Sequence, residues 1–205
     1  MWIAESSGRH RSVNCNGHET NDNPGMGTGS CESVRREDNE MNRVQTTISV
    51  RHVSISIEKT FSETCSRFES RMGRIDYAAF DKKLSEREAE TSIRNYVKGI
   101  EGPLGLMIFN AIDHGLLLSL AGKTARAKQY VVGNPLIALQ MTQRDVRAGL
   151  YAPLRIYIRE DGPNKSVIEY DLPSTLFGQF QNAEVDRVAM MLDQKLEAAI
   201  EYVST

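Results

Sequence analysis

The sequence predicts a two-layer α+β domain, in which a mixed sheet of about five strands carries helices packed mainly on one face. Helical and strand patterns alternate along the chain, but the strand patterns are few for the number of helices. Neither a Gly-x-Gly-x-x-Gly motif after a strand nor a Gly-x-x-x-x-Gly-Lys-Ser/Thr motif occurs. These observations disfavour a doubly wound nucleotide-binding fold.

The first half of the domain is predicted to begin with a strand and to continue in helices. Residues 44–57 are rich in Val, Ile and Thr and partly alternate, which is typical of a strand. Apolar residues then recur every three to four positions over 58–72 and again over 76–100, as on one face of a helix. Ser85 followed by Glu88 matches a capping box, which predicts that a second helix starts there.

In the second half, polar residues that can cap a helix stand directly before helical patterns. The predicted caps are Asp113 before 114–121, Asn134 before 135–150 and Asn182 before 183–203. Gly122 can adopt the left-handed conformation that ends a helix, and Pro135 is a favoured first helical residue. The predicted strands of this half are 104–112, 125–132, 152–161 and 166–172, the last two forming a hairpin.

Composition excludes several classes of partner. The 205-residue chain has 25 Lys and Arg against 27 Asp and Glu, so no excess of positive charge indicates nucleic acid or an anionic membrane. Its apolar runs are all shorter than the roughly 18 residues needed to span a bilayer, and the amino terminus has no apolar secretory block. We therefore expect a soluble cytoplasmic protein without nucleic-acid or membrane partners.

The amino-terminal segment differs in composition from the rest. Residues 1–40 are rich in Gly, Asn, Ser and Glu, and such a segment cannot bury enough apolar surface to offset its ordering entropy. We predict a disordered polar tail over 1–40 and a single α+β domain over 41–205. Because the ordered pattern begins directly after Met41, we hypothesise that natural translation starts at that residue.

The tail also contains side chains that can bind zinc, His10, Cys15, His18 and Cys31. Only Cys15-x-x-His18 has zinc-like spacing, whereas structural zinc sites usually take their ligands in two tight pairs. We expect a solvated tail and no metal site. Cys65 lies on the apolar face of the predicted helix over 58–72, which favours a core residue over a nucleophile.

One long segment resembles a known family. The run "LMIFNAIDHGLLLSLAG", the Gly-Asn-Pro corner in "VVGNPLIALQM", and "APLRIYIRED" followed by "VIEYDLPS" occur in the order typical of the domain of unknown function 302 family. The resemblance implies a small α+β protein that forms a homodimer and has no established activity. The stretch 74–103 is similar to a helical insertion that longer members carry.

Asp113 and His114 form the strongest candidate for catalysis. A histidine at the end of a strand beside a carboxylate can act as a general acid or base, or can bind a metal. The other interpretation is structural, because Asp113 is already explained as a helix cap and His114 can bond to a neighbouring turn.

Five further residues are candidates for ligand binding, namely Gly133, Asn134, Arg155, Tyr157 and Tyr170. Amides at the Gly-Asn-Pro corner can hold an anion, although the turn and cap explain the same residues. Arg155 and Tyr157 share one face of their strand and with His114 can line a pocket; alternatively, Tyr157 is core and Arg155 is solvated or at a dimer interface.

Three functions follow from these patterns. The first is a dimeric binding or accessory module with a small-molecule site near Asp113-His114 and Gly133-Asn134-Pro135. The second is an enzyme that uses His114, oriented by Asp113, as general acid and base on a small polar substrate. The third is a purely structural homodimer. The sequence names no cofactor.

Overall fold

The computed structural model describes residues 43–205, of which Gln45–Thr205 forms one compact unit. The predicted tail over 1–40, the start at Met41 and the four possible zinc ligands lie outside the described residues.

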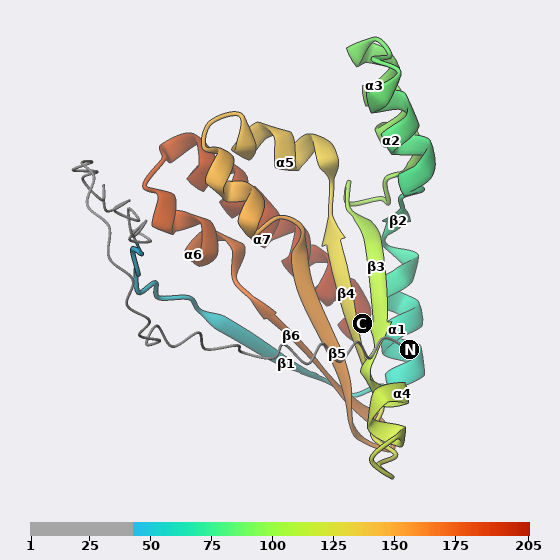
Figure 1. The fold of residues 1–205 in the computed structure, drawn as a ribbon. Helices are drawn as coiled ribbons and strands as arrows, with labels where there is room; N and C mark the ends of the chain where they lie inside the picture. Colours follow the sequence, from blue (N-terminus) through green and yellow to red (C-terminus); the bar gives the residue numbers. More distant parts are fainter. Residues whose placement is uncertain (1–42) are drawn as a thin grey trace, which may run out of the picture. The chain divides into compact units, whose positions relative to one another are not determined.

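The fold is the predicted two-layer α+β arrangement with helices mainly on one face of the sheet (Figure 1). Within the described residues the sheet has six strands in the order β1-β6-β5-β4-β3-β2. The strands are β1 (His52–Ile57), β2 (Gly73–Arg74), β3 (Met107–Asp113), β4 (Ala127–Gly133), β5 (Leu154–Gly162) and β6 (Lys165–Asp171). Neighbouring strands are antiparallel except for the pair β2 and β3. The sixth strand is β2, whose two residues are too short for a periodic pattern.

The helices follow the predicted order, with one short addition. They are α1 (Phe61–Ser70), α2 (Tyr77–Ser85), α3 (Glu90–Ile100), α4 (His114–Ser119), α5 (Pro135–Thr142), α6 (Pro173–Phe177) and α7 (Ala183–Ser204). The addition is α6, which starts at a proline directly after β6. Among the described residues, no helix has both the length and the apolar character that crossing a membrane requires.

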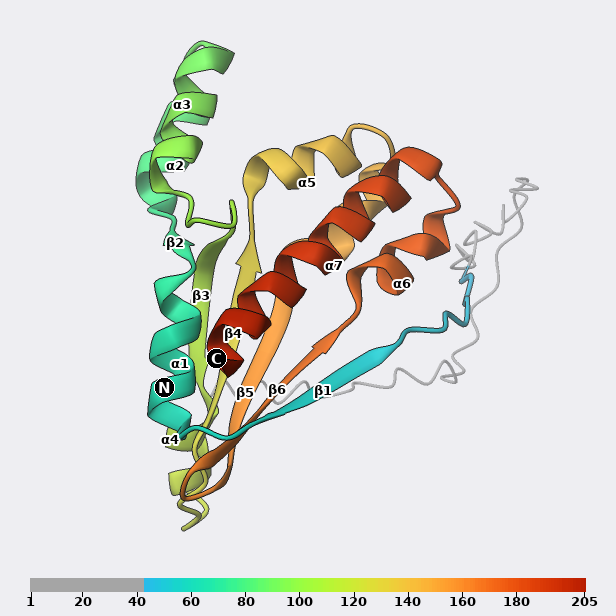
Figure 2. The same cartoon turned by 180° about the vertical axis from the view of Figure 1, so that it is seen from behind.

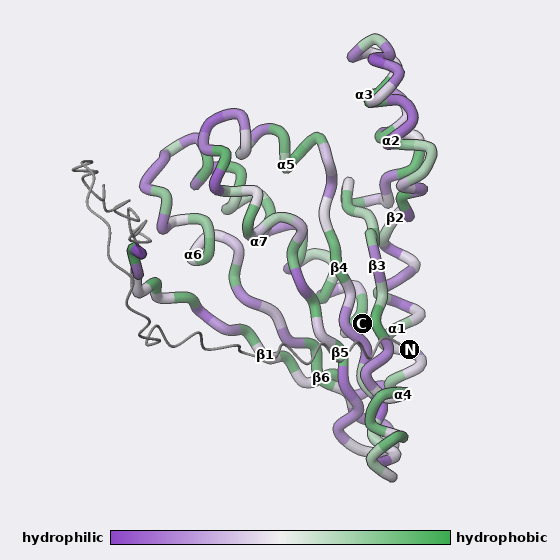
Figure 3. Tube along the Cα trace, viewed as in Figure 1, coloured by the Kyte–Doolittle hydropathy of each residue, from purple (hydrophilic) through white to green (hydrophobic). Residues whose placement is uncertain are grey.

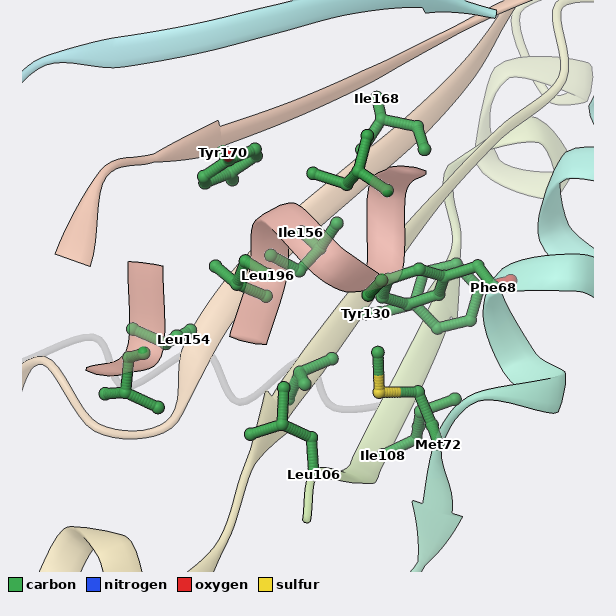
Figure 4. Close-up of a cluster of buried hydrophobic side chains, with 14 of the residues drawn as sticks. Phe68, Met72, Leu106, Ile108, Tyr130, Leu154, Ile156, Ile168, Tyr170 and Leu196 are labelled. Carbon is green, nitrogen blue, oxygen red and sulfur yellow. The ribbon is translucent and has the colours of Figure 1, made fainter. Parts of the chain in front are cut away.

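Helices α1 and α7 cover one face of the sheet, as Figure 2 shows, and the opposite face is turned to the viewer in Figure 1. Phe68 of α1 and Leu196 of α7 meet Tyr130, Ile156 and other strand residues in the buried core (Figure 4). The rings of Phe68 and Tyr130 have centroids 5.2 Å apart. Burying these large side chains is the main stabilising contribution.

The predicted caps of the second half are confirmed. The carboxylate of Asp113 accepts the Leu116 amide, and the side chains of Asn134 and Asn182 cap α5 and α7 in the same way. Gly122 has the expected positive φ, +70°. Each cap satisfies an amide that would otherwise lack a partner in the first helical turn.

The predicted capping box at Ser85 was wrong. Ser85 is the last residue of α2, and its hydroxyl donates to the Lys82 carbonyl. The chain then turns through Arg87, which has a φ of +52°, and α3 starts only at Glu90. Glu88 accepts a hydrogen bond from the Ser92 hydroxyl instead of reaching back to Ser85.

Helices α2 and α3 form a helical arm, Tyr77–Ile100, that extends past the end of the sheet (Figures 1 and 2). Two glycines at its base lie in close backbone contact. A Cβ atom on Gly73 would overlap the Ile100 carbonyl oxygen, and one on Gly102 would overlap the Arg71 carbonyl oxygen. The segment that leads into the arm and the segment that leaves it can therefore cross here only because Gly73 and Gly102 have no side chains.

Candidate ligand-binding cavity

The corner at Asp113 and His114 and the corner at Gly133 and Asn134 lie at opposite ends of the ladder between β3 and β4. Gly133 pairs with Met107 at one end, and Asp113 pairs with Lys128 at the other. A strand rises about 3.3 Å per residue, so the corners are on the order of 20 Å apart. The structure thus does not bring Asp113 and His114 into one cleft with Gly133.

At the first corner, Asp113 acts as a helix cap. Its Oδ1 accepts the Leu116 amide at 3.1 Å, and among the described contacts it makes no hydrogen bond to His114. The imidazole of His114 lies edge-on against the ring of Tyr157, with centroids 5.7 Å apart, and its buried Nε2 has no partner in the described part of the chain. His114 therefore lacks the carboxylate that would orient it as a base.

The hairpin candidates separate onto two faces of the sheet. Arg155 and Tyr157 point to the face without α1 and α7, where Arg155 is exposed and lines a hollow of about 430 Å³. Tyr170 pairs with Ile156 and points into the core on the other face. Burial, together with the negative charges of Asp193 and Glu197, raises the pKa of Tyr170, so its hydroxyl stays neutral.

The second corner opens on an apolar cavity of about 220 Å³. Its walls come from the arm, from β3 and β4, from the strand and loop around Pro153, and from α5, α6 and α7. The lining side chains include Tyr77, Phe80, Phe109, Ile137, Met141 and Phe177, together with Gly133, Asn134 and Pro135 of the corner. A Cβ atom on Gly133 would lie 3.1 Å from the Phe109 ring, so this wall of the cavity needs a small residue.

The buried side chain of Asn134 is already fully engaged. Its Nδ2 donates to Oε2 of Glu101 at 2.7 Å and to the Gly105 carbonyl at 2.9 Å, while its Oδ1 accepts the Leu136 amide at 2.8 Å. An amide has two donor hydrogens and one acceptor oxygen, so little capacity remains for a ligand. Asn134 therefore fixes the shape of the corner, and the cavity it borders is apolar.

Sequence reasoning missed the aromatic residues of this cavity, Tyr77, Phe80, Phe109 and Phe177. Tyr77 and Phe80 belong to the arm, and a helical pattern does not tell which part of the protein its apolar face will contact. Phe109 lies at an irregularity of β3, where the register shifts between Ile108 and Asn110. Such a bulge redirects a side chain that regular alternation would place elsewhere.

A second, polar groove of about 530 Å³ lies between α1 and α4 and includes Asp113. At its wall, the Tyr130 hydroxyl donates to Oε1 of Glu69 at 2.7 Å, and Lys128 and Arg74 pair with the same carboxylate. Partial burial opposes ionisation of Glu69, but the Tyr130 hydrogen bond and the Lys128 and Arg74 charges lower its pKa overall. The cluster is thus an internally satisfied ion network.

Two further observations bear on the chemistry of the described residues. Burial raises the pKa of the Cys65 thiol, which confirms a core residue, because the reactive thiolate is disfavoured. Within residues 43–205, no set of three or more His, Cys, Asp or Glu side chains is arranged to hold a metal ion.

The fold and the sequence together define a member of a family whose biochemical role is unknown. The chain belongs to the family described as "Domain of unknown function DUF302", whose model matches residues 81–203. This confirms the resemblance seen in the sequence. The matched region begins inside α2 and so includes most of the arm.

A solved structure of the same family has a similar fold. It is the crystal structure of an uncharacterized conserved protein DUF302 from Bacillus stearothermophilus, at 14% sequence identity and a TM-score of 0.52. The similarity covers 74% of this chain and 97% of the other, and it supports the fold alone. A search of curated proteins gives no match.

Proposed function

We propose that this chain is a binding module that holds a small apolar molecule in the cavity beside Gly133, Asn134 and Pro135. The observation that carries the proposal is a cavity of about 220 Å³ with almost entirely apolar walls. A closed apolar cavity of roughly 150 Å³ is enough to bind benzene. The space here therefore suits a compact ring or a short branched group, in keeping with the largely apolar lining of small-molecule sites.

The proposal includes a homodimer. Helix α4 buries none of its residues, and Leu116, Leu117 and Leu120 are 69%, 57% and 86% exposed. Figure 3 shows the hydrophobic stretch at this end of the sheet. Neighbouring exposed leucines are unfavourable in water, and a second copy of the chain would bury them.

An enzyme that uses His114 as general acid and base is the alternative function, and it has less support. The imidazole lies edge-on against Tyr157, at the end of the sheet remote from the apolar cavity. A His114→Ala variant separates the two functions. It leaves ligand binding in the cavity unchanged under the proposal, whereas an enzyme would lose turnover.

Native mass spectrometry of the purified full chain tests the assembly and retained compounds together. We expect a dimer, and Leu116→Ser together with Leu120→Ser shifts it towards the monomer. A monomeric wild-type chain would contradict the dimer. A compound released from the wild-type protein would identify the ligand directly.

An NMR titration with phenol and with cyclohexanol then tests the cavity itself. We expect both probes to shift the methyl signals of Ile137 and Met141, which line the cavity. Ala138→Trp fills the cavity and abolishes both shifts, whereas the matched control Ala78→Trp, on the exposed surface of α2, leaves them unchanged. If neither probe binds the wild-type chain, the proposed site is overturned.

A further inference from the structure

The helical arm supplies an aromatic wall to the apolar cavity. Tyr77 and Phe80 both lie on α2 and both line the cavity, although α2 buries none of its residues fully. The other side of the cavity is formed by the core helices α5, α6 and α7, with Met141 and Phe177 among the lining residues. The arm thus contributes rings to this space while most of its own surface stays in solvent.

The rings around the cavity are arranged as aromatic neighbours. Tyr77 and Phe109 have centroids 5.7 Å apart with planes inclined at 47°, and Phe80 stacks on Tyr96 at 6.5 Å. Aromatic rings gain stabilisation from tilted or offset contacts with another ring, beyond the area they bury. A planar aromatic ligand gains these contacts in the cavity, and a saturated ring of equal size does not.

The aromatic wall formed by Tyr77 and Phe80 contains one hydroxyl group, that of Tyr77. The Tyr77 hydroxyl makes no hydrogen bond to the rest of the described chain, and the residue is 48% exposed. Partial burial and the nearby Asp81 charge raise its pKa, so the hydroxyl keeps its proton. Asn134, in contrast, has no spare donor. A polar substituent on a ligand therefore finds its partner at Tyr77.

The position of the wall is fixed at the base of the arm. The amides of Gly73 and Gly102 both donate to the Leu106 carbonyl, at 2.8 and 3.0 Å, and Tyr77 follows β2 within three residues. Backbone contacts at the two glycines therefore hold α2 beside the cavity, although the arm buries little surface of its own.

Resting on the proposed function, we infer that the cavity selects a planar aromatic ligand with one polar substituent, and that Tyr77 and Phe80 determine this specificity. The two rings provide the aromatic wall, and the Tyr77 hydroxyl binds the substituent. The rest of the lining provides apolar volume.

Phenol and cyclohexanol test this inference, because they share size and hydroxyl group but differ in aromatic character. We expect the wild-type chain to bind phenol about three- to tenfold more tightly than cyclohexanol. The double variant Tyr77→Leu, Phe80→Leu keeps apolar bulk and reduces this ratio to less than about twofold. Tyr202→Leu, an exposed tyrosine of α7 outside the cavity, is the control and keeps the wild-type ratio.

A second variant separates the ring from the hydroxyl. Tyr77→Phe is expected to weaken the binding of both probes by a similar factor, about three- to tenfold, while the preference for phenol remains. If the double leucine variant does not fold, Tyr77→Phe still tests the inference, because an unchanged affinity for both probes would overturn the role of the Tyr77 hydroxyl.

The outcomes distinguish the two proposals. Both probes can bind the wild-type chain with equal affinity while Ala138→Trp abolishes the binding of both. In that case the cavity is confirmed as a binding site, and the aromatic specificity is overturned. A preference that survives the double variant equally overturns the role of Tyr77 and Phe80. If neither probe binds the wild-type chain, both proposals fall.

Discussion

The helix-covered core and the helical arm are built from helices of the same kind but are stabilised differently. Seven residues of α7 are buried against the sheet and α1, whereas α2 buries none and α3 buries only Val97. No residue of Tyr77–Ile100 belongs to the main buried cluster. The difference teaches that an amphipathic pattern predicts a helix but does not tell how much of its apolar face will be buried.

The arm uses its apolar residues elsewhere. Its aromatic side chains contact one another and line the cavity, and an ion pair joins Lys83 of α2 to Glu88 in the turn before α3. Such contacts are worth little to global stability because they stay close to solvent. Substitutions in such a region can therefore alter the ligand proposed for the cavity without unfolding the core.

The largest expected effect comes from shortening a core side chain. Leu196→Ala removes a fully buried side chain of α7 and leaves a cavity, so we expect a loss of about 2–5 kcal/mol in the free energy of unfolding. Leu84→Ala in α2 removes a leucine that is 47% exposed and should cost less than about 1 kcal/mol. Urea denaturation measures both, and equal losses would break the comparison.

The base of the arm is expected to be the next most sensitive position. Gly73→Ala places a methyl group on the Ile100 carbonyl oxygen, and relieving this overlap should cost about 1–3 kcal/mol. Gly99→Ala is the matched control, because no atom lies within 4 Å of its Cβ position. It should stabilise α3 by about 0.5–1 kcal/mol. Thermal and urea unfolding of the pair check this, and an unchanged Gly73→Ala protein would contradict it.

The ion network under the sheet should make stability depend on pH. The pKa of Glu69 in the folded chain is below its ordinary value of 4.5, so its contribution is present above that value and is lost as the pH falls through the folded pKa. Tyr130→Phe removes the hydrogen bond to the carboxylate and should cost about 1–2 kcal/mol near neutral pH. Its loss of stability between about pH 5 and pH 3 should then be smaller than in the wild-type chain.

Denaturation curves at each pH measure this difference. A parallel pH dependence in the two proteins would exclude Tyr130 as the group that lowers the pKa of Glu69. Lys83→Gln, which breaks an ion pair confined to the arm, is the control and should leave the unfolding midpoint unchanged.

The smallest global effect is expected from a cap in the arm. Asp76 caps α2 through the Ala79 amide, and Asn182 caps α7 through two amides. Asn182→Ala should lower the free energy of unfolding by about 1 kcal/mol. Asp76→Ala should leave it nearly unchanged and accelerate amide hydrogen exchange only within α2. Equal global losses would show that the arm unfolds together with the core.

Much of the fold could be predicted because its signals are local. Asp113, Asn134 and Asn182 each indicate a helix start, because a short polar side chain there accepts a hydrogen bond from a backbone amide of the first turn. The burial of Cys65 followed from its place on an apolar helix face. Ser85 misled because its hydroxyl found a carbonyl of the preceding turn, an alternative that serine always has.

The candidate cavity was only half predictable. The corner at Gly133 and Asn134 was visible as a turn, but its aromatic partners were not. Tyr77 and Phe80 reach the cavity only because the crossing at Gly73 and Gly102 places the arm there, and Phe109 only because β3 is irregular. These are contacts between distant segments, and no local pattern encodes them.

The sequence by itself determined the elements, their caps and the family, because each depends on residues within a few positions of one another or on a run long enough to compare. The tertiary structure alone decided which candidates share a space. Strand pairing put Asp113 and Gly133 at opposite ends of one ladder and Tyr157 and Tyr170 on opposite faces of the sheet. Alternation within one strand can be predicted from the sequence, but the pairing register between strands, which sets these relative positions, exists only after the chain has folded.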